Sequence, residues 1–273
     1  MSRIAARFAE LKKQNRAAFV PFITAGDPDA DTSFAIMEKL PAMGADLIEL
    51  GAPFSDPMAD GPAVQAASLR ALKSGATMHK TLEMVRRFRK GDQKTPVILM
   101  GYYNPIHHYG TAKFARDAAA AGVDGLITVD LPPEEDEVLR VPANAQSIDI
   151  VRLLAPTTND HRLKTVLKDA SGFLYYVSVA GVTGTKTFDA SEVEAALKRI
   201  HSASPLPCCV GFGIRTPEQA ARIARIADGA VVGSAIVSRI AELSANGAKR
   251  AELVKDVADF CKSLADSVHA ARG

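Results

Sequence analysis

The sequence predicts an α/β protein of one domain over residues 1–273, a single closed (β/α)₈ barrel with an extra N-terminal helix. Short apolar runs alternate with segments of helical periodicity along the chain, a pattern that indicates a parallel sheet covered by helices. One motif recurs where helices lead into strands, as Gly44-Ala-Asp46, Gly122-Val-Asp124 and the variant Ala227-Asp228-Gly229. Eight such units without a linker favour a closed barrel over an open sheet.

The expected strands are the apolar runs between the helical segments. They are Phe19–Thr24, Asp46–Leu50, Val97–Gly101, Gly125–Val129, Asp149–Leu153, Phe173–Ser178, Cys208–Phe212 and Ala230–Gly233. Near the N-terminus, Ile4, Phe8 and Leu11 share one helical stripe after Ser2, so a short capped helix packed on the barrel is expected. Pro41 falls inside a helical run and should end or kink that helix.

Composition excludes several classes of protein. The 33 basic and 31 acidic residues give a net charge of +2, which offers no reason to expect nucleic acid or a membrane surface as a partner. No run of about 18 apolar residues occurs, so no membrane span is expected. The three cysteines show no zinc or disulfide spacing, and buried reduced thiols fit a cytoplasmic protein.

A carboxylate interrupts the second expected strand. With a period of two, Leu47 and Glu49 share one face of the strand, whereas Ile48 and Leu50 share the other. Glu49 therefore lies among apolar residues near the carboxyl end of a strand, where barrel enzymes keep their active sites. Burial raises the pKa of a carboxyl group towards values that suit proton transfer. A structural ion pair with an arginine is the alternative.

The loop after this strand contains three prolines and two aspartates between Ala52 and Pro62. Prolines fix the course of a loop, and loops after barrel strands carry catalytic groups. Asp60 is expected to lie over the barrel mouth and to face Glu49. Asp56 comes earlier in the loop, and we interpret it as a turn-capping or partner-facing residue.

Glycines cluster after the last three strands and predict a phosphate site. The clusters are Gly181-Val-Thr-Gly184, Gly211-Phe-Gly213 and Gly233-Ser234, the last of which opens a helix. Glycine lets backbone N–H groups approach an anion closely, and a helix N-terminus adds a favourable dipole. Each cluster alone is typical of a plain turn, but all three converge on one corner of a barrel.

The run from Glu49 to Pro62, ELGAPFSDPMADGP, resembles the signature of the tryptophan synthase alpha family. Other segments match that family in order, and they are Phe22–Pro28, Met100–Pro105, Asp130–Pro133, Leu154–Thr157, Ser178–Gly184, Gly211–Arg215 and Val231–Ala235. The resemblance covers nearly the whole chain. Departures stand at Ala52, Met58, Met100 and Val179. None affects either carboxylate, although Met100 is placed to change how an indole ring packs.

The resemblance implies a lyase that cleaves indole-3-glycerol phosphate to indole and glyceraldehyde 3-phosphate. Glu49 would move protons, and Asp60 would stabilise the indole N–H. The implied substrate-binding residues, whose alternative role is core packing, are Phe22, Met100, Tyr102, Tyr175, Thr183 and Phe212. The implied phosphate-binding residues are Gly184, Gly213, Gly233 and Ser234.

The resemblance also implies a pyridoxal-phosphate β subunit as partner in an α₂β₂ tetramer, with no cofactor and no metal on this chain. The implied interface residues are Pro53, Phe54, Asp56, Asn104, Pro105 and Asp130. Another phosphate-binding barrel lyase and a non-catalytic regulatory barrel remain as alternatives. A Schiff-base aldolase would need a lysine in a strand, and a metal aldolase would need clustered histidines, neither of which the expected elements contain.

Overall fold

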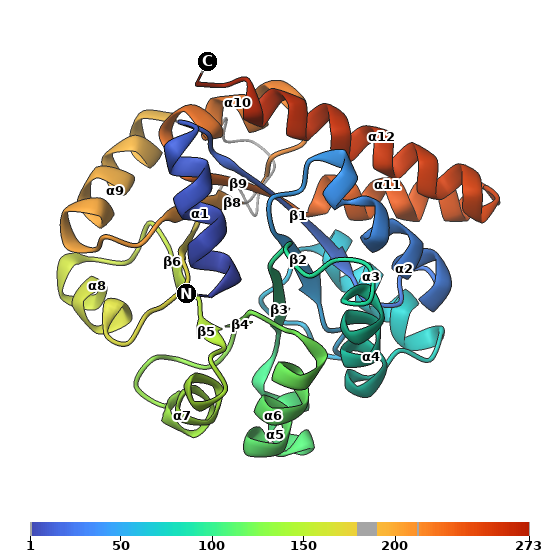
Figure 1. Ribbon diagram of the computed structural model, residues 1–273, viewed down its shortest axis with the longest axis horizontal. Coiled ribbons are helices and arrows are strands. Elements are labelled where there is room, and N and C mark those ends of the chain that lie inside the picture. Colours follow the sequence, from blue (N-terminus) through green and yellow to red (C-terminus); the bar gives the residue numbers. More distant parts are fainter. Residues whose placement is uncertain (1, 179–189, 212, 273) are drawn as a thin grey trace.

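The computed structural model describes residues 2–178, 190–211 and 213–272, and it shows a ring of parallel strands surrounded by helices (Figure 1). The strands are β1 (Ala18–Thr24), β2 (Ile48–Gly51), β3 (Val97–Gly101), β4 (Gly125–Thr128), β5 (Asp149–Ile150), β6 (Arg152–Leu154), β7 (Leu174–Val177), β8 (Cys208–Gly211) and β9 (Gly229–Val232). Their order is β5-β4-β3-β2-β1-β9-β8-β7-β6. This nearly closed TIM-type barrel confirms the predicted fold class.

The fifth expected strand is broken into β5 and β6 at Val151. Here the chain changes neighbours, because β5 pairs with β4 whereas β6 pairs with β7. The N–H of Val151 still donates to the carbonyl of Leu126 at 3.0 Å, but the N–H of Ile150 donates to the Ser171 hydroxyl. The two ends of the sheet therefore meet within one segment, and the ring closes there.

Apart from α1, which precedes the first strand, the helices follow the strands and cover the outside of the ring. They are α1 (Arg3–Lys13), α2 (Ala30–Lys39), α3 (Pro62–Lys73), α4 (Met78–Phe88), α5 (Tyr103–Tyr109), α6 (Thr111–Ala121), α7 (Glu137–Ala145), α8 (Asp160–Leu167), α9 (Ala190–Ala203), α10 (Pro217–Ile226), α11 (Ser234–Ala245) and α12 (Arg250–His269). As predicted, α2 stops before Pro41, which begins a short 3₁₀ turn, η1 (Pro41–Met43). Among the described residues, no helix has both the length and the apolar character needed to cross a membrane.

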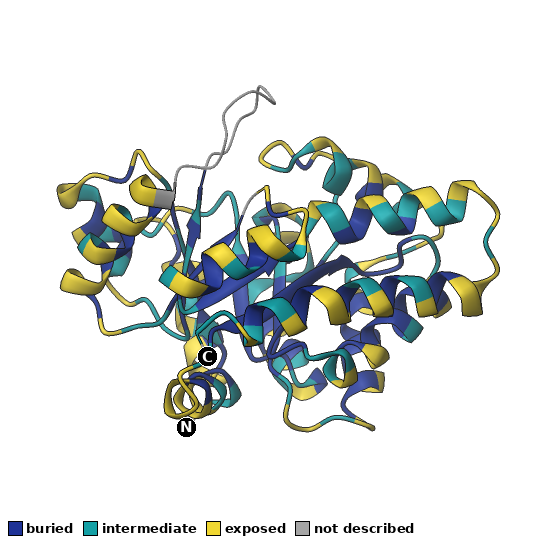
Figure 2. Cartoon of the chain, turned by 90° about the horizontal axis from the view of Figure 1, so that it is seen from above, coloured by how far each residue is buried: buried dark blue, intermediate teal, exposed yellow. Residues whose placement is uncertain are grey.

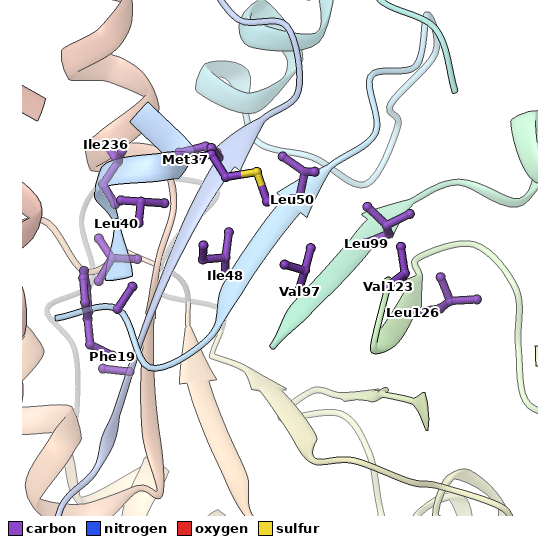
Figure 3. Close-up of a cluster of buried hydrophobic side chains, with 14 of the residues drawn as sticks. Phe19, Met37, Leu40, Ile48, Leu50, Val97, Leu99, Val123, Leu126 and Ile236 are labelled. Atoms are coloured by element: carbon purple, nitrogen blue, oxygen red, sulfur yellow. The ribbon is translucent and has the colours of Figure 1, made fainter. Parts of the chain in front are cut away.

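Apolar side chains form two layers, one on each side of the strands. Ile48 and Leu50 of β2 point outward and pack with residues of α2 such as Met37 (Figure 3). Leu47 points inward and packs inside the ring. The predicted alternation of faces is therefore confirmed, and it turns the intervening Glu49 away from the helices. Figure 2 shows the buried strands at the centre and exposed outer faces on the helices.

Helix α1 closes the ring at the amino ends of the strands. The Ser2 hydroxyl caps it by accepting the N–H of Ala5, as the sequence predicts. Ile4, Phe8 and Leu11 pack into the inner apolar layer, where the Phe8 ring lies 5.7 Å from the ring of Phe173. This closure leaves the carboxyl ends of the strands as the open mouth of the barrel.

The aspartates of the recurring motif bind the start of a neighbouring strand at this closed end. The N–H of Asp46 donates to the Phe19 carbonyl at 2.9 Å, and its carboxylate accepts the Phe19 N–H at 2.7 Å. Asp124 makes the same reciprocal pair with Val97, and Asp228 makes it with Cys208. The sequence repeat thus corresponds to one repeated hydrogen-bonding unit.

We expect Asp46→Asn to lower the free energy of unfolding by about 3–5 kcal/mol, because breaking a buried ion pair leaves its partners uncompensated. The Asp46 side chain is fully buried against Arg7, Arg16 and His269. Urea unfolding at neutral pH measures the loss. Asp266→Asn is the control. Asp266 is an exposed partner of Lys262, so its substitution should change the free energy of unfolding by less than about 1 kcal/mol.

The Asp46 effect should also depend on pH. Burial raises the pKa of Asp46, but hydrogen bonds from His269 and the Phe19 N–H, together with nearby Arg7, outweigh burial and lower it below its ordinary value. The difference in unfolding free energy between wild type and Asp46→Asn should therefore be largest above the ordinary pKa of an aspartate. It should decrease as the pH falls through the lowered pKa of Asp46 in the folded protein. A difference that stays constant into strong acid would contradict this account.

Candidate active site

A cavity of about 700 Å³ opens at the carboxyl ends of the strands, opposite α1. Inward-facing residues of the strands form its floor, and these include Phe22, Glu49, Met100, Tyr175 and Val231. The loops after β2, β4 and β8 supply its sides. The cavity therefore lies where the sequence places the candidate carboxylates and glycines.

Glu49 is the most buried ionisable group of this cavity, with an exposed fraction of 2%. The register of β2 places it between Phe22 of β1 and Ile98 of β3. Its Oε1 atom has no hydrogen-bond partner, and no arginine or lysine in the described ranges pairs with it. Burial, helped by the charge of Asp60, raises the pKa of Glu49 to about 8. The structural ion pair that we considered as an alternative is therefore not seen.

Asp60 lines the same cavity from the loop between β2 and α3. The Asp60 N–H donates to the Pro57 carbonyl at 3.0 Å, and the Asp60 carbonyl accepts the Gln65 amide at 2.8 Å. Burial raises the pKa of Asp60 to about 6, although a hydrogen bond from Tyr102 opposes the rise. Asp56 of the same loop is exposed and takes a hydrogen bond from Ser55. The two aspartates thus have different surroundings.

The residues expected around the substrate fall into three groups. Phe22 and Tyr175 line the cavity together with Met100, whereas Tyr102 does not line it and lies against the Asp60 loop. Thr183 and Phe212 lie outside the described residues. Tyr175 needs the glycine at position 211, since a Cβ there would lie 2.4 Å from the Tyr175 hydroxyl.

Three of the four expected phosphate-binding residues meet at one side of the cavity, and these are Gly213, Gly233 and Ser234. Gly184 lies outside the described residues. Gly213 has φ +82°, a left-handed conformation that side chains rarely adopt. Gly233 precedes α11, and no side chain within the described ranges caps the first turn of this helix, so its N–H groups are available to an anion.

The cavity also reaches a side that sequence reasoning missed. Between α7 and α8 it is lined by Asp136, Arg140, Arg152 and Arg162, and Asp136 forms a buried ion pair with Arg152. The signal was a charged residue inside the fifth expected strand, Arg152 within Asp149–Leu153. In the described ranges, no three His, Cys, Asp or Glu side chains are grouped so that they could hold a metal ion.

The expected interface residues follow β2, β3 and β4 at the carboxyl ends of these strands, and Asp130 is the one among them that lines the cavity. Pro53, Phe54 and Asp56 lie in the loop after β2, where the side chain of nearby Met58 is 79% exposed. Asn104 and Pro105 lie in the first turn of α5. Asp130 follows β4, and its carboxylate accepts the Tyr103 N–H at 2.7 Å. Asp130 therefore caps α5 in addition to any role towards a partner.

Comparison with known proteins agrees with this architecture. The family model described as tryptophan synthase alpha chain matches residues 8–269. Tryptophan synthase subunit alpha from Legionella pneumophila str. Paris is 40% identical, with 98% of each chain covered and a TM-score of 0.91. Tryptophan synthase from M. tuberculosis, in its aminoacrylate-bound form, is 33% identical, with 98% of this chain and 100% of that chain covered and a TM-score of 0.87.

A third structure, from Aquifex aeolicus VF5, is 35% identical over 98% of this chain and 99% of that chain, with a TM-score of 0.87. The family match and these likenesses extend over almost the entire barrel. The chain therefore belongs to the tryptophan synthase alpha chain family and is a lyase of tryptophan biosynthesis that cleaves indole-3-glycerol phosphate to indole and glyceraldehyde 3-phosphate.

Proposed function

We propose that Glu49 and Asp60 perform this cleavage inside the cavity. The observation that carries the proposal is the unpaired, buried carboxyl of Glu49, which shares one cavity with the second carboxyl of Asp60. Perturbed carboxyl groups in a cleft are typical of acid–base catalysis. Their environments raise the two pKa values unequally, to about 8 for Glu49 and about 6 for Asp60. At neutral pH one group is thus mainly protonated and the other mainly ionised.

This difference suits the two roles that the reaction needs. Glu49 as an acid donates its proton to C3 of the indole ring, and the ring nitrogen gains positive character. The Asp60 carboxylate accepts a hydrogen bond from the ring N–H and stabilises that charge. As the bond from C3 to the glycerol carbon breaks, the Glu49 carboxylate takes the proton of the glycerol hydroxyl, which becomes the aldehyde. The proton count closes, and Glu49 is again protonated.

The remaining walls of the cavity bind and orient the substrate in this proposal. Phe22, Met100 and Tyr175 would contact the indole and glycerol portions, because they form the apolar floor beside Glu49. Gly213, Gly233 and Ser234 would hold the phosphate through backbone N–H groups at the start of α11. Holding the phosphate fixes the reacting carbon relative to both carboxyl groups.

We also propose that a pyridoxal-phosphate β subunit docks over the mouth in an α₂β₂ tetramer and receives the indole directly. The expected interface residues Phe54, Asp56 and Asn104 follow strands β2 and β3 at their carboxyl ends, and Met58 of the loop after β2 presents an exposed apolar side chain. Exposed apolar residues that surround a cavity often mark an interface. Indole is small and neutral, so a partner over the mouth would prevent its loss to water. No cofactor on this chain enters the proposed steps.

Glu49→Gln should lower kcat by about 10²–10⁴-fold with little change in substrate affinity, since the amide keeps the shape but cannot transfer the proton. Indole release under saturating substrate measures kcat, and ligand titration measures affinity. Glu194→Gln on the outer face of α9 is the control, because Glu194 pairs only with the exposed Lys198 among the described residues. A Glu49→Gln enzyme that keeps most of its kcat would remove Glu49 from the mechanism.

The same mechanism predicts a bell-shaped dependence of kcat/KM on pH in the wild type. Activity should rise as Asp60 ionises near pH 6 and fall as Glu49 loses its proton near pH 8. The two limbs belong to the interacting pair, because each carboxyl affects the other. In Glu49→Gln the alkaline limb should disappear from the residual activity. An alkaline limb that persists unchanged in this variant belongs to another group.

Gly213→Val should raise KM for the phosphorylated substrate roughly tenfold or more, since a charge-assisted hydrogen bond contributes about 1.5–3 kcal/mol. The comparison substrate is indole glycerol without phosphate, whose KM should change much less. Gly247→Val is the matched control, because Gly247 also has positive φ but lies in open space at the turn between α11 and α12. Equal KM changes for both substrates would place the phosphate elsewhere.

We also propose that docking of the β subunit couples to catalysis and raises the cleavage rate of this chain. Asp56→Lys should weaken that stimulation, because the charge of an exposed residue in the loop after β2 is reversed. We expect the β-subunit concentration for half-maximal stimulation to rise roughly tenfold, from lost charge complementarity. Asp259→Lys on α12 makes the same reversal at another exposed position. If added β subunit leaves the wild-type rate unchanged, the coupling proposal fails even though the lyase assignment stands.

A further inference from the structure

Tyr102 occupies an unexpected position beside the cavity. It is the residue before α5, only 3% of it is exposed, and it does not belong to the described cavity lining. Ala59, Asp60 and Gly61 of the loop after β2 do belong to that lining. Tyr102 therefore meets the back of the catalytic loop, and a direct substrate contact does not account for its place.

Its side chain contacts this loop in three ways. The Tyr102 hydroxyl accepts the N–H of Ala59 at 3.0 Å, which places it beside the neighbouring Asp60 carboxylate, whose ionised form it favours. The Tyr102 ring packs against the ring of Phe54, with the ring centres 5.2 Å apart. One side chain thus holds the loop at its start, along its backbone and at its functional carboxylate.

The position of Tyr102 is itself fixed from the opposite side. Asp130 accepts the N–H of Tyr103 at 2.7 Å and so satisfies a free donor at the start of α5. The adjoining strand ends are joined too, since Ala52 donates to Met100 at 2.8 Å and Val129 donates to Gly101 at 2.9 Å. The phenol therefore extends from a rigid strand end towards a loop that has few backbone hydrogen bonds of its own.

We propose that Tyr102 is a positioning residue for the cleavage, whose hydroxyl fixes the loop over the cavity and keeps the Asp60 carboxylate ionised and aimed at the indole N–H. This inference rests on the proposed role of Asp60. The hydroxyl touches Asp60 and Ala59 and acts on the reaction only through them. Tyr102 would thus resemble the outer groups that orient catalytic side chains in other enzymes.

The electrostatic effect has a definite sign. Burial raises the pKa of Asp60, whereas the hydrogen bond from Tyr102 lowers it, because a donor to the ionised form favours that form. Among the described residues, the other titratable groups that face Asp60 are Glu49 of β2 and Tyr175 of β7. Neither donates a hydrogen bond to Asp60. Loss of the Tyr102 hydroxyl should therefore raise the pKa of Asp60 further.

The test compares Tyr102→Phe with Tyr103→Phe in the full chain. Both lose one phenolic oxygen, but the Tyr103 hydroxyl has only His107 as a hydrogen-bond partner within the described part of the chain, at 3.5 Å on the surface. We expect Tyr102→Phe to lower kcat about 10–100-fold, as for loss of a hydrogen bond to a charged group. The acid limb of kcat/KM should also move to higher pH. Tyr103→Phe should leave both unchanged.

A second measurement reads Asp60 without substrate. Titration of ¹³C-labelled aspartate carboxyl groups by NMR, with Asp60→Asn to assign the signal, should show a higher pKa of Asp60 in Tyr102→Phe. A ring-fluorinated tyrosine at position 102 is a stronger donor of nearly the same size and should shift that pKa downward. This substitution also tests the proposal if Tyr102→Phe does not fold.

The outcomes separate the two proposals. Shifts in both the NMR titration and the acid limb support the role of Tyr102. If the pKa of Asp60 shifts in the NMR titration but the acid limb of kcat/KM does not move, the effect of Tyr102 on Asp60 is supported. In that case the proposed role of Asp60 in cleavage fails. An unshifted Asp60 titration in both the phenylalanine and the fluorotyrosine proteins overturns the positioning role.

Discussion

The reciprocal hydrogen bonds between buried aspartates and strand starts hold the register on which the rest of the molecule depends. Asp46, Asp124 and Asp228 each bind both backbone groups of one residue at the start of an adjacent strand. A slip by one residue would turn every side chain of a strand to the opposite face. In β2 such a slip would replace Glu49 by Leu50 in the cavity floor and would place a carboxylate among the helices. The charged residues at the closed end thus determine the chemistry at the open end.

The two ends of the barrel shift the pKa of a buried carboxyl group in opposite directions. At the closed end, Asp46 has cationic and backbone partners that lower its pKa despite burial. At the open end, Glu49 has no such partners among the residues that the structure describes, and burial raises its pKa to about 8. A buried carboxyl without partners is costly to ionise, so it retains its proton at neutral pH. The same side-chain chemistry therefore stabilises the fold at one end and supplies an exchangeable proton at the other.

Sequence reasoning succeeded where one periodicity determines the answer. Alternation in β2 correctly placed Ile48 and Leu50 outside and Leu47 inside, and the glycine-aspartate repeat correctly indicated a repeated unit. It could not locate the break at Val151, because the point where a strand exchanges neighbours depends on closure of the whole ring. Nor could it find the contact of Tyr102 with Ala59, since these residues are 43 positions apart and meet only through the loop conformation. The ion pair between Arg152 and Asp136 was missed because these residues also meet only in the folded chain.

Helix α1 has a consequence for the way the chain acquires its structure. It is synthesised before the barrel strands, yet the side chains that cover Phe8 and its neighbours include Phe173, Cys209 and Val231, far along the sequence. His269 of α12 similarly reaches back to Asp46, and Arg272 to Asn15. Such distant contacts form late, because long loops must close before the contacts contribute. During translation α1 therefore keeps its apolar stripe uncovered until most of the barrel has left the ribosome, and such exposed apolar surface makes an unfinished chain prone to aggregate.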